Sequence, residues 1–321
     1  MRTLSNPGLN FNEMTHIVYI HFGSSYYQKY SLHQSHHTNP ASDIYLVSDN
    51  DSIKYPFLKN IDIQRFNTTA KEFAKSYKHL STNLFDYELF CFQRWFILNE
   101  ISKEFGFEKL LYLDSDVMLF ENVPQDLERY TPFSFTIANG SSPHICYFPD
   151  TKVLDEFCTF LMEMYTSPVY MEKMDAKHRH HQEHNEAGGV CDMTAFDYFQ
   201  QFKGYKALEL TEVRNDSVYD NNINMADGFV FDEKNRIKKI EFENKRPFGL
   251  TTGTRKRIAF KALHFQGGDA KKFMPLFYQY ADLEPEKKQD FAFIKQNKNK
   301  AAVRKVKNNI KSVIKKILGR D

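Results

Sequence analysis

The sequence holds few of the residues on which small cross-linked folds depend. Among 321 residues there are four cysteines, 11 prolines, 13 glycines and a single tryptophan. The cysteines stand far apart, without a CxxC pair or zinc-type spacing, so the sequence predicts neither a disulfide framework nor thiol catalysis, and a reducing cytosolic compartment is expected. They are Cys91, Cys146, Cys158 and Cys191.

Long apolar runs and several nucleotide-binding motifs are also missing. No stretch of about 18 apolar residues occurs, so no transmembrane helix is predicted. The first residues, MRTLSNPGLNFNEM, contain no apolar centre of the kind that a secretory leader needs. The motifs G-x-S-x-G, Walker A and G-x-G-x-x-G are absent, which removes the common serine-hydrolase, P-loop and dinucleotide-binding classes.

What the chain does contain is core-forming material. Hydrophobic residues make up 41% of it and aromatic residues 15%, with 30 phenylalanines and 18 tyrosines. This composition excludes disordered, collagen-like and mucin-like proteins. The length fits one large α/β domain or two smaller domains.

Charge is unevenly distributed along the chain. The formal net charge is +2, but residues 298–321 carry nine basic side chains against one carboxylate, a net of +8, which leaves −6 on the first 297 residues. Within 303–318 the valines, isoleucines and leucine form one stripe at helical spacing, with lysines opposite. We therefore predict that residues 291–321 form a basic amphipathic tail on an anionic membrane surface. Residues 303–318 lack aromatics that stack on bases, so nucleic acid is not expected as a partner.

Apolar runs alternate with helical patterns through the first part of the chain. Residues 16–20, 43–49 and 61–66 are predicted to be strands, and residues 83–105 a helix that ends before a glycine. Residues 109–120 have the pattern of a strand, a polar break and a second apolar segment. This alternation predicts an α/β fold with a Rossmann-like, mostly parallel sheet flanked by helices.

Later segments continue the pattern. Strands are expected at 133–138 and 258–265, and helices at 155–165, 192–202 and 269–281. The polar, histidine-rich residues 172–187 are expected to form a loop or lid, and its histidines, like those near residue 35, are expected to face water rather than to hold a metal. These histidines are His33, His36, His37, His178, His180, His181 and His184.

Two acids stand where the strand beginning at residue 109 should end. Asp114 and Asp116 flank Ser115 in LYLDSDVMLF. The carboxyl end of a buried strand is where α/β proteins form ligand crevices, and two carboxylates so close together need a cation or hydrogen-bond donors. Oxygen ligands of this kind suit Mn²⁺ or Mg²⁺, which bridge to diphosphates. The alternative is that both acids cap the following turn.

A second polar cluster follows the predicted strand at 258–265. In KALHFQGGDAKKF, His264 is followed by Gly267 and by the pair Lys271 and Lys272. An imidazole can complete the ligand shell of a metal beside carboxylates. Glycine lets backbone N–H groups approach phosphate oxygens, and a lysine adds positive charge there. A core histidine followed by an ordinary turn is the alternative.

Together these two segments resemble the glycosyltransferases of the GT-A fold, notably the retaining family 8 galactosyl- and glucosyltransferases. Those enzymes pair an acid-x-acid motif after a hydrophobic strand with a late H-x-x-G-x-x-K element that closes over the nucleotide diphosphate. Here the segment from His264 to Gly267 matches that element, and Lys271 follows one place late because of the extra Gly268. The order of elements is similar from about residue 16 to residue 280.

The resemblance implies a metal-dependent transferase with Mn²⁺ or Mg²⁺ as cofactor. Asp114, Asp116 and His264 would bind the metal, Asp116 most directly, and Asp114 would also approach the donor ribose. Lys271 or Lys272 would neutralise the departing phosphate. For Arg94 an exposed helical charge is the alternative to donor contact. The other residues implied to hold the nucleotide donor are His21, Phe22, Gly23, Asp49, Arg94 and Gly267.

The segment NEAGGVCDMTAFDYF, residues 185–199, is the third candidate. In GT-A enzymes the region between the acid motif and the final histidine contacts the donor sugar and the acceptor. By resemblance, Asp192 contacts donor hydroxyls, or acts as general base if the enzyme inverts, and Glu186 is the weaker candidate for either role. A plain helix cap is the alternative for Asp192.

The sequence as a whole therefore predicts a GT-A domain over residues 1–290 with the tail behind it, at the cytoplasmic face of a membrane. It would move a hexose from a nucleotide sugar, UDP-linked by preference, to a glycan or glycolipid hydroxyl in cell-surface polysaccharide synthesis. Two alternatives stay open: a catalytically silent nucleotide- or metal-binding module at a membrane, and a sugar-phosphate nucleotidyltransferase. The lack of a glycine-rich basic loop after the first strand counts against the nucleotidyltransferase.

Overall fold

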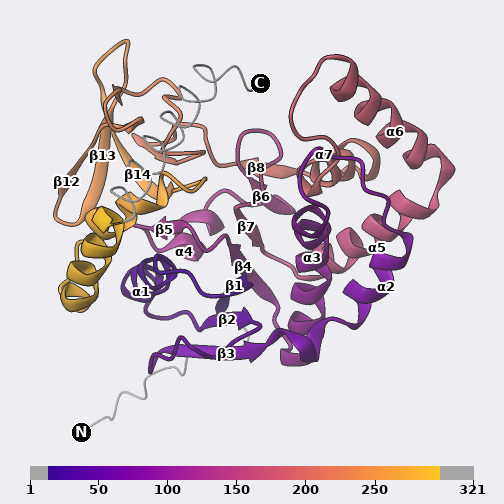
Figure 1. Ribbon diagram of the computed structural model, residues 1–321, viewed down its shortest axis with the longest axis horizontal. Helices are drawn as coiled ribbons and strands as arrows, with labels where there is room; N and C mark the ends of the chain where they lie inside the picture. The colour runs from indigo at the N-terminus through magenta and orange to yellow at the C-terminus, as the bar shows by residue number, and fades with distance from the viewer. Residues whose placement is uncertain (1–13, 297–321) are drawn as a thin grey trace, which may run out of the picture.

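The computed structural model describes residues 14–296 and is built around a five-stranded mixed sheet (Figure 1). The strand order is β3-β2-β1-β4-β7, with β3, β2, β1 and β4 parallel and β7 antiparallel to β4. The predicted α/β class, with a mostly parallel sheet flanked by helices, is confirmed. The strands are β1 (Thr15–His21), β2 (Ile44–Ser48), β3 (Leu58–Asp62), β4 (Lys109–Leu113) and β7 (Ile145–Phe148).

Side chains of this sheet alternate between two apolar layers, because successive residues of a strand point to opposite faces. In β1, Val18 and Ile20 face the larger core, whereas Ile17 and Tyr19 face the other side. Trp95, the only tryptophan, is fully buried in the larger core. Burial on both faces explains why these strands are continuous apolar runs in the sequence.

Helices cover the two faces unequally (Figure 1). The larger core lies under α2, α3, α5 and α7, and the other face is covered by α1, α4 and the second sheet. Helix α3 ends at Gly106, whose φ of 65° is the left-handed conformation common at helix C-caps. The helices are α1 (Gln28–Thr38), η2 (Ile63–Phe66), α2 (Thr68–Ser76), α3 (Phe85–Phe105), α4 (Val123–Glu128), α5 (Lys152–Thr166), α6 (Pro168–Glu183), α7 (Asp192–Lys203), η3 (Lys271–Phe273) and α8 (Met274–Phe277).

A second sheet has the order β12-β13-β14-β5, and β9 pairs in parallel with β14. Strand β5 follows β4 after three residues, so the chain passes from the first sheet to the second at Asp114–Asp116. Two further strand pairs are β6 with β8 and β10 with β11. These strands are β5 (Val117–Leu119), β6 (Phe135–Ile137), β8 (Ala207–Glu209), β9 (Ser217–Tyr219), β10 (Phe231–Asp232), β11 (Ile237–Lys238), β12 (Ile240–Glu243), β13 (Arg246–Leu250) and β14 (Arg257–His264).

The histidine-rich segment is not the loop that the sequence predicts. Most of residues 172–187 belong to helix α6, which begins with Pro168 in its first turn and buries only Met174. No potential metal-ligand group within residues 14–296 includes a histidine of this helix. A helix with one buried residue shows almost no apolar periodicity, which is why the pattern is missed.

Three other expectations need correction. The third strand is Leu58–Asp62, three residues earlier than predicted, and residues 63–66 form the short helix η2. The helix expected at 269–281 is reduced to η3 and α8, separated from a helical stretch at 284–296. His33 of α1 is buried instead of facing water, whereas His36 and His37 pack against aromatic rings but stay partly exposed.

The predicted boundary between residues 290 and 291 falls inside the helical residues 284–296. The amphipathic pattern at 303–318 lies outside the described residues. Within residues 14–296, no helix is both long enough and apolar enough to cross a bilayer.

Candidate functional site

The acid motif lies where the two sheets meet. Strand β4 delivers Asp114 and Asp116 at its carboxyl end, and β14 runs antiparallel to β5 so that His264 pairs with Val117. The backbone N–H of Phe265 donates to the carbonyl oxygen of Asp116 at 2.9 Å. This strand pairing brings the late histidine to the acid motif across a long stretch of sequence.

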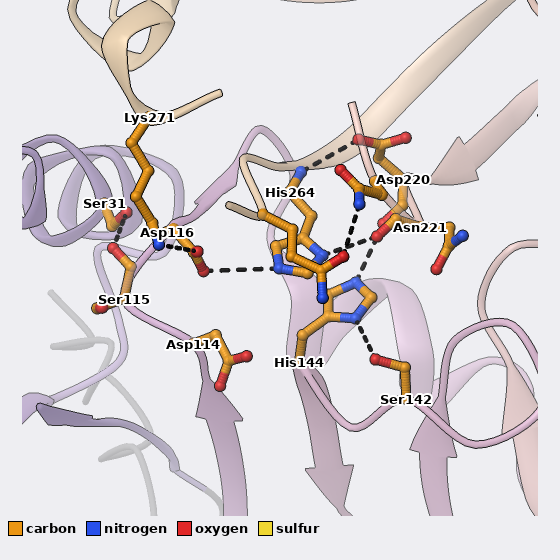
Figure 2. A network of polar contacts seen from close by, with 12 residues as sticks. Ser31, Asp114, Ser115, Asp116, Ser142, His144, Asp220, Asn221, His264 and Lys271 are labelled. Carbon is orange, nitrogen blue, oxygen red and sulfur yellow. Dashed lines mark hydrogen bonds and ion pairs between the residues drawn. The ribbon is translucent and has the colours of Figure 1, made fainter. Parts of the chain in front are cut away.

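Asp116 is buried between Lys271 and His264 (Figure 2). Its Oδ2 lies 3.0 Å from Lys271 Nζ, and its Oδ1 lies 3.6 Å from His264 Nε2. Burial alone would raise the pKa of Asp116, but hydrogen bonding and charge from His264 and Lys271 outweigh it and hold the pKa well below its ordinary value. Asp116 is therefore an anion at neutral pH and the strongest cation-attracting group of the site.

His264 is held with one nitrogen toward Asp116. Its Nδ1 lies 2.7 Å from the carbonyl oxygen of Asn221, and its ring stacks on His144 with centroids 4.0 Å apart (Figure 2). Burial lowers the pKa of His264, but Asp116 more than compensates, so the pKa is raised. A carbonyl acceptor on one ring nitrogen fixes the tautomer that leaves Nε2 free for a metal.

His144 is a residue that sequence reasoning misses. It is fully enclosed, with Nε2 3.1 Å from the carbonyl oxygen of Asp220 and Nδ1 3.0 Å from Ser142 Oγ. Burial and the neighbouring His264 lower the pKa of His144, so it stays neutral. The only signal in the sequence is a histidine directly before the apolar run of β7, which by itself indicates a core histidine.

Arg94 joins Asp114 to Asp192. Its guanidinium donates to Asp114 Oδ1 at 2.7 Å and to Asp192 Oδ2, and its side chain is only 11% exposed. Burial would lower the pKa of Arg94, but Asp192, Tyr112 and Asp114 raise it, so the charge is permanent. Asp114 also accepts from Tyr112 at 2.7 Å. Arg94 is thus not an exposed helical charge, and its direct partners are protein carboxylates.

The donor set fits a divalent cation. One oxygen each from Asp114 and Asp116 and one nitrogen of His264 lie within 4.8 Å of one another. Two carboxylates and one imidazole supply negative charge and both oxygen and nitrogen donors, which suits Mn²⁺ or Mg²⁺. Lys271 occupies the position of a counter-cation to Asp116, which is what a site built for positive charge requires when it holds no metal.

A cavity of about 340 Å³ opens beside these acids. Helix α3 contributes Tyr87 and Arg94, α6 contributes Lys177, and α7 contributes Asp192, with His264 at the acid end. The lining mixes both signs of charge with hydroxyl and amide groups, as expected for a polyhydroxylated ligand. Asp192 is held in this wall by Arg94 and by Trp95 Nε1 at 3.1 Å.

The predicted residues at the ends of β1 and β2 form a small cluster beside the acid motif. The backbone N–H of Gly23 donates to Asp49 Oδ1 at 2.7 Å, and Phe22 is 47% exposed. His21 Nδ1 lies 2.9 Å from the hydroxyl of Ser115, the residue between the two acids. The carboxyl ends of β1, β2 and β4 thus bring these side chains to one edge of the sheet.

The remaining predicted residues do not all lie close to the acid motif or the cavity. Gly267 has a φ of 82°, and its loop is held by Asn224 Nδ2, which donates to the Gln266 carbonyl at 3.1 Å. Lys272 lies 3.3 Å from the exposed Asp269, so Lys271 is the lysine that reaches the acids. Glu186 is outside the cavity wall and lies 3.6 Å from His181.

Gly189 lines the cavity and also packs closely against backbone. It bridges to Ser81, and a Cβ added to it would lie 2.3 Å from the Leu80 carbonyl oxygen at a φ of 148°. We expect Gly189→Ala to destabilise the protein by about 2–3 kcal/mol through the clash and the strained φ. Chemical denaturation measures this. Gly253→Ala, where nothing lies within 4 Å, is the control, and equal losses would refute the explanation.

No protein-family model and no curated protein matches the sequence. Similar solved structures include mouse xyloside xylosyltransferase 1, 10% identical over 63% of this chain and 87% of its own, with a TM-score of 0.43. The bifunctional glycosyltransferase WbbM is 13% identical over 89% of this chain and 53% of its own, with a TM-score of 0.44. The glycosyltransferase GlyE of Streptococcus pneumoniae TIGR4 is 14% identical over 61% of this chain and 45% of its own, with a TM-score of 0.29. Likeness this distant assigns no activity, so function is inferred from the site.

Proposed function

We propose that the protein is a metal-dependent GT-A glycosyltransferase that moves a hexose from a nucleotide diphosphate sugar to a glycan or glycolipid hydroxyl. The observation that carries the proposal is the convergence of Asp114, Asp116 and His264, with Lys271, at the edge of a polar cavity. A departing diphosphate needs positive charge, and a hexose needs a pocket of polar side chains. In this site the positive charge of Lys271 and the polar cavity lie side by side.

Asp114, Asp116 and His264 would hold Mn²⁺ or Mg²⁺, which as a Lewis acid stabilises the leaving diphosphate. Lys271 lies close enough to share that role, because its ammonium already contacts Asp116. The cluster of His21, Gly23 and Asp49 at the ends of β1 and β2 is our candidate for the nucleoside side of the donor, with the exposed Phe22 ring as a surface for the base.

Asp192 and Arg94 belong to the sugar side of the cavity. Because Arg94 and Trp95 both donate to Asp192 Oδ2, the carboxylate is fixed in direction. We assign Asp192 the role of contacting donor-sugar hydroxyls. If a departing phosphate oxygen accepts the acceptor proton, as retention allows, the enzyme needs no separate base, and this is the mechanism we favour. The cytoplasmic membrane location of the tail is proposed from its sequence alone.

The direct test of the class is nucleotide release from a panel of UDP- and GDP-sugars, with Mn²⁺ and with EDTA. Slow hydrolysis of one donor that requires the metal supports the transferase and identifies the sugar. Absence of release from every donor, together with absence of Mn²⁺-dependent nucleotide binding, would leave the acids as a structural turn. A silent binding module would bind nucleotide with metal but release no sugar.

Because Lys271 and a metal would compete for Asp116, replacing Lys271 should strengthen metal binding but lower turnover. In Lys271→Met the carboxylate loses its resident cation, so Mn²⁺ should bind the free protein several-fold more tightly. Turnover should nevertheless fall by about 10²-fold, because the leaving phosphate loses a positive charge. Calorimetry and steady-state kinetics measure the two effects.

Lys272→Met is the matched control, since among the ion pairs within residues 14–296 that lysine pairs only with the exposed Asp269. The Lys272→Met variant should change neither the affinity for Mn²⁺ nor turnover by more than about twofold. If Lys271→Met weakened Mn²⁺ binding, the lysine would not be a competitor at Asp116. If turnover were unchanged, it would have no role toward the phosphate.

A further inference from the structure

A second group of potential metal ligands comes from α1 and from the segment after α8. His33 and His37 stand four residues apart on α1 and therefore share a face of the helix. His33 Nδ1 lies 2.9 Å and His37 Nε2 lies 2.8 Å from the same atom, Asp282 Oδ2. Two imidazoles and one carboxylate thus converge on a single point.

We propose that His33, His37 and Asp282 form a second metal site for a borderline divalent transition ion, with Zn²⁺ as its natural occupant. Imidazole nitrogen with carboxylate oxygen is a donor set that such ions prefer over Mg²⁺ or Ca²⁺. The three ligand atoms lie within 4.8 Å of one another. The proposal does not rest on the proposed transferase activity.

The surroundings of Asp282 have the features of a ligand shell. Its second oxygen, Oδ1, accepts from the hydroxyl of Tyr278 at 2.6 Å, as ligating carboxylates commonly do. His37 stacks on Tyr280 with ring centroids 3.8 Å apart, and His33 makes edge contacts with Tyr55.

Charge also favours a cation here. No lysine or arginine within residues 14–296 forms an ion pair with Asp282. Glu286, one helical turn beyond Asp282, acts electrostatically on His33, and its Oε2 is buried without a hydrogen-bond partner among the described residues. The carboxylates of Asp282 and Glu286 thus favour a cation beside the two imidazoles.

The position of this site indicates that a bound ion would link two parts of the structure. Asp282 follows Lys271 by eleven residues, and α1 contacts the acid motif, because the hydroxyl of Ser31 donates to the Ser115 carbonyl at 2.8 Å. An ion held by α1 and Asp282 would fasten the segment that carries Lys271 to the helix that supports the acids. The side chains of His37 and Asp282 are 29% and 37% exposed, so an ion can reach the site from solvent.

The test is metal binding by the full chain after EDTA treatment and dialysis, with Zn²⁺ by equilibrium dialysis and Co²⁺ by its visible spectrum. Asp116→Asn is the reference protein, because it weakens the first site. We expect Asp116→Asn to bind one equivalent of either metal at the second site. Adding His37→Gln should weaken that binding at least about tenfold, although the glutamine amide can still donate to Asp282 and so preserve the packing.

His36→Gln in the same reference protein is the matched control, since His36 stacks on Phe57 and is not among the converging ligands. It should retain the full equivalent, and all variants should show the same circular dichroism. The proposal is overturned if folded Asp116→Asn binds no Zn²⁺ or Co²⁺, or if it binds them equally well with and without His37→Gln.

Discussion

Replacing Asp116 by asparagine is expected to lower metal-dependent donor turnover by roughly 10³-fold, the scale of losing one preorganised electrostatic group. The substitution preserves the shape of the side chain but removes its charge. Asp116 faces Lys271 on one oxygen and His264 on the other, so no neighbouring acid can take its place. Steady-state nucleotide release with saturating Mn²⁺ measures the effect.

Asp269→Asn is the matched control, because that carboxylate lies in the loop after His264 but is fully exposed. It should retain wild-type turnover, and both variants should unfold at similar denaturant concentrations. Wild-type turnover in Asp116→Asn would exclude the metal-dependent transferase proposed here. Full loss of turnover in Asp269→Asn would show that the loop, rather than the acid, is the sensitive feature.

The part of this site that could be predicted from sequence is the part fixed by local pattern. A buried parallel strand must be an apolar run, and the polar residues that end it must lie at the sheet edge. That reasoning places Asp114, Asp116, Asp49 and His21 correctly at strand ends. It also places His264 at the end of its own strand, but not beside a particular acid.

The sequence alone does not indicate which distant strands and helices lie next to each other. His264 reaches Asp116 only because β14 lies antiparallel to β5 with His264 opposite Val117. The double role of Arg94 depends on α3 and α7 packing side by side near the end of β4, which brings Asp192 to Asp114. Neither register nor helix packing leaves a trace in the spacing of these residues along the chain.

The burial of helix α1 is a second feature that could not be predicted from the sequence. Its buried side chains include Gln28, Ser31, Gln34 and Ser35 as well as apolar ones, so it has no apolar stripe. It is enclosed on several sides by the sheet, by β5 and by the segment near Tyr278. His33 Nδ1 and His37 Nε2 both pair with Asp282, a partner 245 or more positions away. From sequence alone such histidines are indistinguishable from exposed ones.

Replacing Arg94 by methionine is expected to cost about 3–5 kcal/mol of unfolding free energy, because it leaves carboxylates inside the protein without their counter-charge. Asp192 has a side chain only 5% exposed and depends on Arg94 for its ion pair, and Asp114 loses the same partner. Methionine keeps most of the volume, so packing changes little. Urea unfolding monitored by circular dichroism measures the loss, and Arg65→Met, at an exposed position, should cost less than about 0.5 kcal/mol.

A double-mutant cycle separates this electrostatic cause from a packing defect. Asp192→Asn removes one of the stranded charges while its amide oxygen can still accept from Trp95, so Arg94→Met should cost less in the Asp192→Asn background than in the wild type. We expect a coupling of more than about 1.5 kcal/mol, the range measured for close buried charge pairs. Additive losses would mean that Arg94 stabilises the protein by packing alone. The coupling would instead show that Arg94 stabilises this wall of the cavity through its charge.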